Sequence, residues 1–219
     1  MARAGLKERL TSTLVTRRLP AGNGKRVLLT FDDGPTPGVT EGVLSRLAAH
    51  GARAIFFVVG RRIERDATLL PQVTAAGHAL GNHSATHDVA ALPSPVAYHR
   101  DLRRCRDLIE RETGAPPRFF RAPAGRLHPA SLLSPVILGM KHVLWSLDSL
   151  DWRCTRDDDA RDAARRVLDT VADGDIVLLH DYAACSHALL DVLLPGLTDA
   201  GFDLGTGLDT LGAEGGRAT

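Results

Sequence analysis

The chain has 219 residues, of which 44% are hydrophobic and 24% are charged, the profile of a folded globular domain. Its 27 basic and 26 acidic side chains leave a net charge of +1, which argues against binding nucleic acid or an anionic membrane through bulk charge. No apolar run reaches the roughly 18 residues that a membrane-spanning helix needs, so we expect no transmembrane segment.

Residues 1–24 are expected to be an N-terminal extension. Residues 1–18 are basic and polar, and we expect a short docking helix there. They lack the central apolar stretch and the small-residue cleavage site of a signal peptide, so we predict a cytoplasmic location. The three cysteines are odd in number and share no metal-ligand spacing, which fits reduced thiols in that compartment. We also expect a monomer.

Residues 25–212 alternate strand-like apolar runs with helix-like segments, and residues 213–219 are expected to be a C-terminal tail. The expected strands are 27–30, 54–59, 118–121, 142–147 and 176–180. The expected helices are 41–50, 69–76, 96–113 and 157–172. Residues 78–82 lead into a pair of histidines, and 188–200 and 202–204 close the alternation. Strands that alternate with helices in this way predict parallel βαβ units in a single α/β domain.

Polar side chains stand at the ends of these strands or in the loops that follow them. Because parallel barrels gather the carboxyl ends of their strands at one mouth, we expect these side chains to meet. They are Asp32-Asp33, His83 and His87, Arg121, Asp148 and Asp151, and His180.

The aspartate pair and the histidine pair together indicate a metal site. Close carboxylates resist joint ionisation unless a partner neutralises them, although two aspartates before Gly34-Pro35 are also ordinary turn residues. In a helical turn the i, i+4 spacing of His83 and His87 places both rings on one face. Two imidazoles and one carboxylate leave coordination positions open, as in catalytic sites. We expect Zn²⁺, with Co²⁺ or Fe²⁺ as alternatives.

Five segments, in this order, resemble the polysaccharide deacetylases, the NodB-homology domain of carbohydrate esterase family 4. They are Thr30-Phe31-Asp32-Asp33-Gly34-Pro35, His83-Ser84-Ala85-Thr86-His87, Arg121-Ala122-Pro123-Ala124-Gly125, Asp148-Ser149-Leu150-Asp151-Trp152 and Leu178-Leu179-His180-Asp181. The resemblance implies a distorted (β/α) barrel of about seven parallel strands. It also implies metal-dependent removal of acetyl groups from N-acetylated sugars.

The resemblance implies a role for each matching residue. Asp32 would be the general base, held oriented and ionised by Arg121. The metal ligands would be Asp33, His83 and His87.

The remaining motifs would supply the acid and the substrate contacts. His180 would be the general acid, tuned by an aspartate of the fourth motif, for which we expect Asp151 over Asp148. A backbone N–H near Ala124, in the segment Pro123, Ala124, Gly125, would add an oxyanion donor. Trp152 and Leu178 would line a small acetyl pocket.

The third motif departs from the family pattern, which usually reads Arg-Pro-Pro-Tyr-Gly. Ala122 stands in place of a proline and Ala124 in place of the tyrosine, which removes an aromatic wall of the groove but keeps a backbone donor. The expected substrate is a chitooligosaccharide or an N-acetylglucosaminyl conjugate. A non-sugar amide or a sugar ester is the alternative on the same scaffold.

Three further functions are weighed against the deacetylase. A non-catalytic glycan-binding module is disfavoured because Asp32 and His180 are both present. Phosphoryl transfer with Mg²⁺ is disfavoured because imidazoles suit Zn²⁺ and no Gly-rich phosphate loop occurs. Cys185 as a thiol nucleophile lacks a third, orienting residue.

Overall fold

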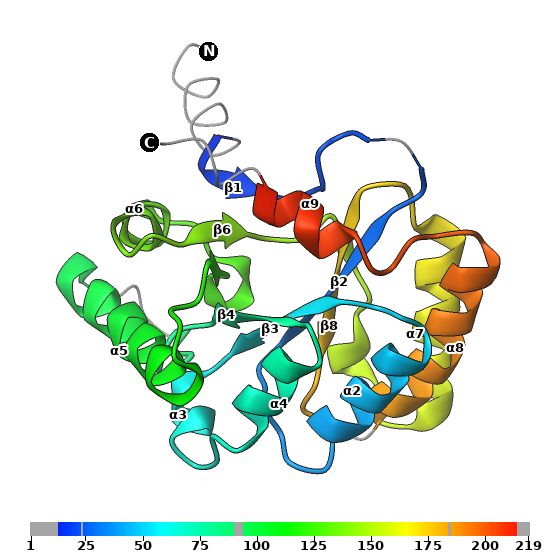
Figure 1. Ribbon diagram of the computed structural model, residues 1–219, viewed down its shortest axis with the longest axis horizontal. Coiled ribbons are helices and arrows are strands. Elements are labelled where there is room, and N and C mark those ends of the chain that lie inside the picture. Colours follow the sequence, from blue (N-terminus) through cyan, green and yellow to red (C-terminus); the bar gives the residue numbers. More distant parts are fainter. Residues whose placement is uncertain (1–12, 23, 90–93, 184, 214–219) are drawn as a thin grey trace.

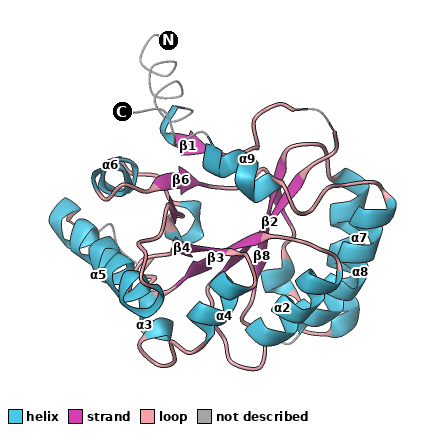
Figure 2. Ribbon diagram, in the orientation of Figure 1, coloured by secondary structure: helices cyan, strands magenta, loops and turns pink. Residues whose placement is uncertain are grey.

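One curved sheet of parallel strands carries the candidate site (Figures 1 and 2). The computed structural model describes residues 13–22, 24–89, 94–183 and 185–213. Within them, eight strands follow the order β1-β6-β5-β4-β3-β2-β8-β7, and every neighbouring pair is parallel. The strands are β1 (Val15–Thr16), β2 (Val27–Asp32), β3 (Ala54–Val58), β4 (Ala79–Asn82), β5 (Phe119–Phe120), β6 (Lys141–Val143), β7 (Leu147–Asp148) and β8 (Asp175–His180).

Helices fill the connections and cover the outside of the sheet (Figure 2). They are α2 (Thr40–Ala49), α3 (Gly60–Ile63), α4 (Leu69–Ala75), α5 (Pro95–Thr113), α6 (Pro129–Ile137), α7 (Asp157–Thr170), α8 (Cys185–Asp199) and α9 (Gly207–Ala213), with the short 3₁₀ helices η1 (Pro123–Gly125) and η2 (Asp151–Arg153). Helices α2, α7 and α8 pack together at one end of the curved sheet, and α5 and α6 pack together at the other end (Figure 1). Among the described residues, no helix has both the length and the hydropathy of a membrane span. The predicted parallel α/β architecture is confirmed.

The strands read as nearly continuous apolar runs because both faces of the sheet are buried. In β2, Leu29 and Phe31 face the helices and belong to the large outer core. Leu28 faces the inside of the curved sheet and packs with Phe57 and Ile176 in a smaller inner core. Because side chains alternate along a strand, Asp32 ends β2 on the inner face, above this core.

The described residues form eight strands, against about seven expected, and the differences lie in residues 142–147 and in the N-terminal extension. The apolar run 142–147 is not one strand: β6 pairs with β5 and β1, whereas β7 pairs with β8. Residues 144–146 cross between these edges, with the Leu144 N–H bonded to the Thr16 carbonyl and the Ser146 N–H to the Ile176 carbonyl. An apolar run of this length does not by itself establish a strand: within the crossing Leu144 is buried, Trp145 is half-buried and Ser146 is exposed.

The N-terminal extension also contributes to the sheet. A docking helix was expected over residues 1–18, but Val15–Thr16 form the edge strand β1; residues 1–12 lie outside the described part. The domain boundaries at residues 24 and 212 stay predictions. Residues 202–204 contribute only an isolated bridge between Arg26 and Asp203.

Helix α6 was missed because its two prolines look like helix breakers. Pro129 occupies the first turn, where its missing N–H costs nothing. His128 and Ser131 cap that turn reciprocally. Only Pro135 lies inside the helix.

Gly81 in β4 allows the inner core to close beneath the site. It is the register partner of Phe57 on β3, and a Cβ at this position would overlap the Phe57 ring. We expect Gly81→Ala to lower the free energy of unfolding by about 1–3 kcal/mol, the usual cost of overpacking a core. Gly212→Ala in α9 is the matched control, because its Cβ would make only ordinary contact with Arg118. Chemical denaturation of both variants measures the difference; equal stabilities would contradict this packing.

Candidate active site

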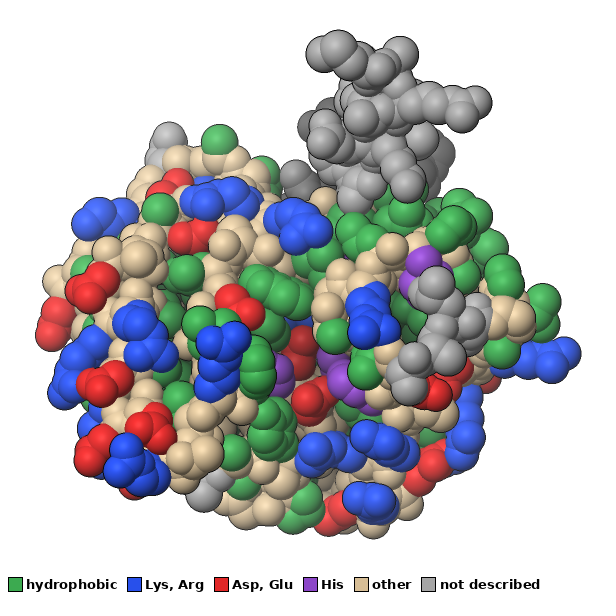
Figure 3. Space-filling view, turned by 180° about the vertical axis from the view of Figure 1, so that it is seen from behind, with side chains coloured by type: hydrophobic (Ala, Val, Ile, Leu, Met, Phe, Trp, Pro, Cys, Tyr) green, Lys and Arg blue, Asp and Glu red, His purple; other side chains and the backbone are tan. Residues whose placement is uncertain are grey.

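The carboxyl ends of β2, β4, β5, β7 and β8 bring the polar residues of the five motifs to one face. Asp32 ends β2, and His180, its register partner, ends β8. His83 follows β4 directly, as Arg121 follows β5. Acidic and histidine side chains accordingly gather near the middle of the face shown in Figure 3.

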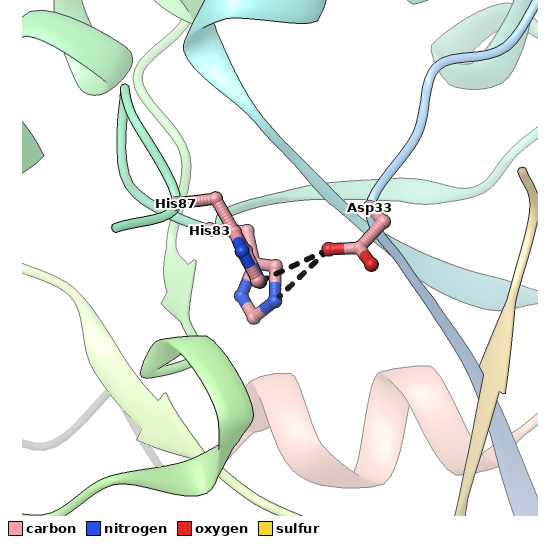
Figure 4. A group of neighbouring side chains, drawn as sticks. All are labelled: Asp33, His83 and His87. Carbon is pink, nitrogen blue, oxygen red and sulfur yellow. Dashed lines mark ion pairs between the residues drawn. The ribbon is translucent and has the colours of Figure 1, made fainter. Parts of the chain in front are cut away.

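Asp33, His83 and His87 converge on one point (Figure 4). Asp33 Oδ1 lies 3.1 Å from His87 Nε2 and 3.6 Å from His83 Nε2. One ligand atom from each residue lies within 4.8 Å of the other two, and among the described residues this group could hold a metal ion. Asp33 reaches this position through a left-handed backbone, with φ of 73°.

The histidine loop is not the helical turn that the i, i+4 spacing predicts. Residues 83–88 are irregular, and Ser84 and His87 have positive φ angles of 69° and 52°. Polar contacts hold the loop in place of a helix. The Asn82 side chain donates to the Leu102 carbonyl and accepts the Ser84 N–H, and the His87 N–H donates to Ser84 Oγ. The rings still meet, with centroids 4.9 Å apart.

The lone pairs of the three ligand atoms point toward one another, an arrangement that suits a cation between them. His83 Nδ1 lies 2.9 Å from the Arg121 carbonyl, which can only accept, so Nδ1 carries a proton and Nε2 is the nitrogen that can offer a lone pair to a metal. Asp33 Oδ1 is buried and has no hydrogen-bond partner among the residues that the structure describes. Burial and the nearby His83 lower the pKa of His87 more than Asp33 and Asp32 raise it, which favours the neutral, metal-binding form. The residues therefore fit a divalent metal ion.

Asp32 has a different partner from Asp33. Its Oδ1 accepts a 2.7 Å hydrogen bond from Arg121 Nη1, and its Oδ2 lies 3.5 Å from His83 Nε2. Asp32 and Arg121, which form an ion pair, are both buried. The two neighbouring aspartates are thus divided between an arginine and the histidine pair, as different roles require.

Arg121 is completely buried, and each nitrogen of its guanidinium donates at least one hydrogen bond. Nε and Nη2 donate to the carbonyls of Val143 and Leu144, and Nη1 also donates to Thr30 Oγ1. The ring of Phe57 lies 4.2 Å below the guanidinium carbon. Burial lowers the pKa of Arg121 and Asp32 opposes this effect, so the side chain stays charged.

His180 is paired with Asp151 and not with Asp148. The imidazole Nδ1 lies 2.7 Å from Asp151 Oδ1, and the backbone N–H of His180 donates to Oδ2 of the same carboxylate. Burial lowers the pKa of His180, but the hydrogen bond and charge of Asp151, with Asp32 and Asp33, raise it to about 9. Asp148 instead accepts the Leu150 N–H within a turn.

The third motif forms η1, a short turn beside the site. Ala124 has a φ of 51°, an unusual conformation for a residue with a side chain, and is exposed. Gly125 also has a positive φ, and a Cβ there would come within 2.8 Å of Trp145. Trp145, which could not be assigned from the sequence, is half-buried between this turn and Arg121. Pro123 is buried.

The proposed acetyl-pocket residues occupy adjoining elements. Leu178 is buried in β8 and Trp152 is half-exposed in η2, where the Arg153 guanidinium lies 4.6 Å from its ring. The Ser149 N–H donates to the Leu178 carbonyl and connects the two segments. Their common pocket stays a prediction.

Asp181 is the last residue of the fifth motif, but no role was predicted for it from the sequence. Its buried carboxylate accepts from Thr40 Oγ1 and fills the space that a Cβ on Gly34 would take. Burial raises the pKa of Asp181 to about 7. The sequence carries two signals for it, its position directly after His180 in the fifth motif and the glycine in Asp33-Gly34-Pro35.

Comparisons with known proteins agree with this geometry. The family model "Polysaccharide deacetylase" matches residues 20–143. The chain is 32% identical over 209 residues to the peptidoglycan-N-acetylglucosamine deacetylase PgdA of Listeria monocytogenes, covering 95% of this chain and only 43% of that protein. It is 33% identical over 199 residues to a chitooligosaccharide deacetylase of Bradyrhizobium sp., covering 82% and 88% of the two chains.

The fold is also similar to that of solved deacetylase structures. The structure of peptidoglycan deacetylase PdaC from Bacillus subtilis superposes with a TM-score of 0.77 at 29% identity, covering 88% of this chain and 94% of the other. The family match spans more than half of the sequence and includes the first three of the five motifs. This chain belongs to the polysaccharide deacetylase family, the NodB-homology group of carbohydrate esterase family 4.

Proposed function

We propose that this protein is a metal-dependent N-deacetylase that hydrolyses the acetamide of an N-acetylated sugar to an amine and acetate. The observation that carries the proposal is the presence of two separate polar pairs, Asp32–Arg121 and His180–Asp151, whose Asp32 and His180 end the neighbouring strands β2 and β8 beside the Asp33–His83–His87 group. Hydrolysis of an amide needs a base for the attacking water and an acid for the leaving amine. The site supplies one candidate for each.

Asp33, His83 and His87 would hold the metal ion, with Zn²⁺ the first choice and Co²⁺ or Fe²⁺ as alternatives. The bound ion would polarise the acetyl carbonyl and acidify a water molecule. The donor set of two imidazoles and one carboxylate supports a metal of this class over Mg²⁺, which prefers oxygen ligands.

Asp32 would take a proton from the attacking water at Oδ2. Its other oxygen accepts from Arg121 Nη1, which fixes the plane of the carboxylate. Arg121 therefore acts as a positioning residue for the base. The backbone N–H near Ala124 would donate to the oxygen that gains charge as the carbonyl is attacked.

His180 would donate a proton from Nε2 to the leaving nitrogen. Asp151 fixes the orientation of the ring through Nδ1, so Nε2 is the nitrogen that can face a substrate. With a pKa of about 9, the ring carries its proton at neutral pH. The acid is therefore ready before the reaction starts.

The substrate class rests on the relatives, which act on peptidoglycan and on chitooligosaccharides. We propose an N-acetylglucosaminyl unit of a short oligosaccharide or conjugate, because Ala124 offers no aromatic wall to hold a long polymer. The same absence keeps a non-sugar amide or sugar ester as the alternative substrate. Monomeric state and a cytoplasmic location stay predictions, which gel filtration and cell fractionation test.

Replacing the base tests the reaction. We expect Asp32→Asn to lower acetate release from chitooligosaccharides by about 10²–10⁴-fold, the usual contribution of a positioned acid or base. Asp148→Asn is the matched control, since its side chain only accepts a hydrogen bond within a turn. Acetate is measured enzymatically over a panel with N-acetylglucosamine, peptidoglycan fragments, acetylated xylan and acetamides. Release from acetamides alone would support the alternative substrate, and equal rates in both variants would refute the role of Asp32.

Metal removal tests the ligand set. We expect chelation to abolish acetate release and Zn²⁺ to restore it. His83→Ala should weaken Zn²⁺ binding by more than about 100-fold, because even outer-shell changes cost 10–100-fold. His50→Ala is the control, as His50 lies at the end of α2 and contacts Thr198. Competition with a chromophoric chelator measures affinity; unchanged binding in His83→Ala would place the metal elsewhere.

The pH dependence of kcat/KM tests the acid. Because His180 must be protonated, activity should fall as pH rises through its pKa of about 9. Asp151→Asn removes the largest of the effects that raise this pKa, while burial still lowers it and Asp32 and Asp33 still raise it, so the alkaline limb should move to lower pH. An alkaline limb that does not move in Asp151→Asn would show that His180 is not the titrating acid.

A further inference from the structure

Two of the three cysteines lie next to the segments that carry the His180–Asp151 pair. Cys154 follows η2, three residues after Asp151, and Cys185 begins α8, five residues after His180. The Sγ atom of Cys185 lies 3.7 Å from the carbonyl oxygen of Cys154 and donates to it. Both side chains are half-buried and pack against the same outer core.

The electrostatics of the two thiols agree with this proximity. Burial is the largest cause that raises the pKa of each thiol. For Cys154 the next largest cause is the charge of Cys185, ahead of Asp151 and Asp159.

We propose that Cys154 and Cys185 are a disulfide-forming pair that joins the segment after η2 to the start of α8. The thiolate of one cysteine attacks a sulfur of oxidised glutathione, forms a mixed disulfide and releases one glutathione thiolate. The second cysteine thiolate then attacks the protein sulfur of that mixed disulfide and releases the second glutathione. The two protein thiols lose two hydrogens and the two glutathione molecules gain them.

The bond would close a loop that contains His180 and begins three residues after Asp151. The two cysteines are separated by 31 positions, and a cross-link over such a loop stabilises the folded state mainly by restricting the unfolded chain. Asp151 and His180 lie just before its two ends. The inference does not rest on the proposed function, because its readouts are covalent structure and thermal stability.

Cys105 is a built-in control for the test. It is completely buried, its thiol donates to the Val58 carbonyl, and burial raises its pKa strongly. It should stay reduced while the other two thiols react. Its presence also means that the number of free thiols in the denatured protein separates the possible products.

The experiment incubates the full-length folded protein with oxidised glutathione at alkaline pH, where more of the raised-pKa thiols ionise. We expect a mass loss of two hydrogen atoms, one remaining free thiol, and a peptide that contains both Cys154 and Cys185 after digestion without reductant. The melting temperature should rise by several degrees, and this rise should disappear in Cys154→Ser and Cys185→Ser. Three free thiols, a stable glutathione adduct, or a link between two molecules would overturn the proposal.

Discussion

The buried guanidinium of Arg121 is the interaction on which the rest of the site depends. It joins β2 to the crossing after β6, because its donors reach Asp32 and Thr30 on one side and the carbonyls of Val143 and Leu144 on the other. Its own carbonyl accepts from His83. A charge at full burial is tolerated only with a partner and satisfied hydrogen bonds, and removing one member of such a pair costs about 3–5 kcal/mol. The proposed base and a proposed metal ligand therefore share one support.

The site solves the problem of two adjacent carboxylates by a backbone turn. Asp32 stays in the strand and faces inward to Arg121, whereas Asp33, at positive φ, turns to the histidines. The buried Asp181 carboxylate packs where a side chain on Gly34 would lie. The positive φ at Asp33 costs conformational free energy, and the surrounding structure must offset it. Asp181, directly after β8, and Thr40, at the start of α2, pack around the turn, so the turn depends on the complete fold.

Local patterns predicted what depends on local chemistry. Apolar runs of strand length, separated by helical segments, predicted the parallel sheet. The polar residues at strand ends predicted which side chains lie together. The i, i+4 histidines were identified correctly as neighbours but assigned the wrong conformation, because the contacts of Asn82 and Ser84 replace a helix. The choice of Asp151 over Asp148 was an expectation from family resemblance; the hydrogen bonds to His180 now support it. Features that rest on distant contacts, such as β1 and the crossing at 144–146, have no local signature.

Acetate release by the metal-loaded Arg121→Lys variant tests the central claim most directly. Lysine keeps the positive charge but has no planar fork, so it cannot hold Asp32 and both carbonyls at once. If orientation of the base by Arg121 matters, the folded variant should retain its metal and lose at least about 100-fold in kcat/KM, the lower range for a positioned base. A folded, metal-loaded variant that releases acetate as fast as the unchanged protein would contradict this account.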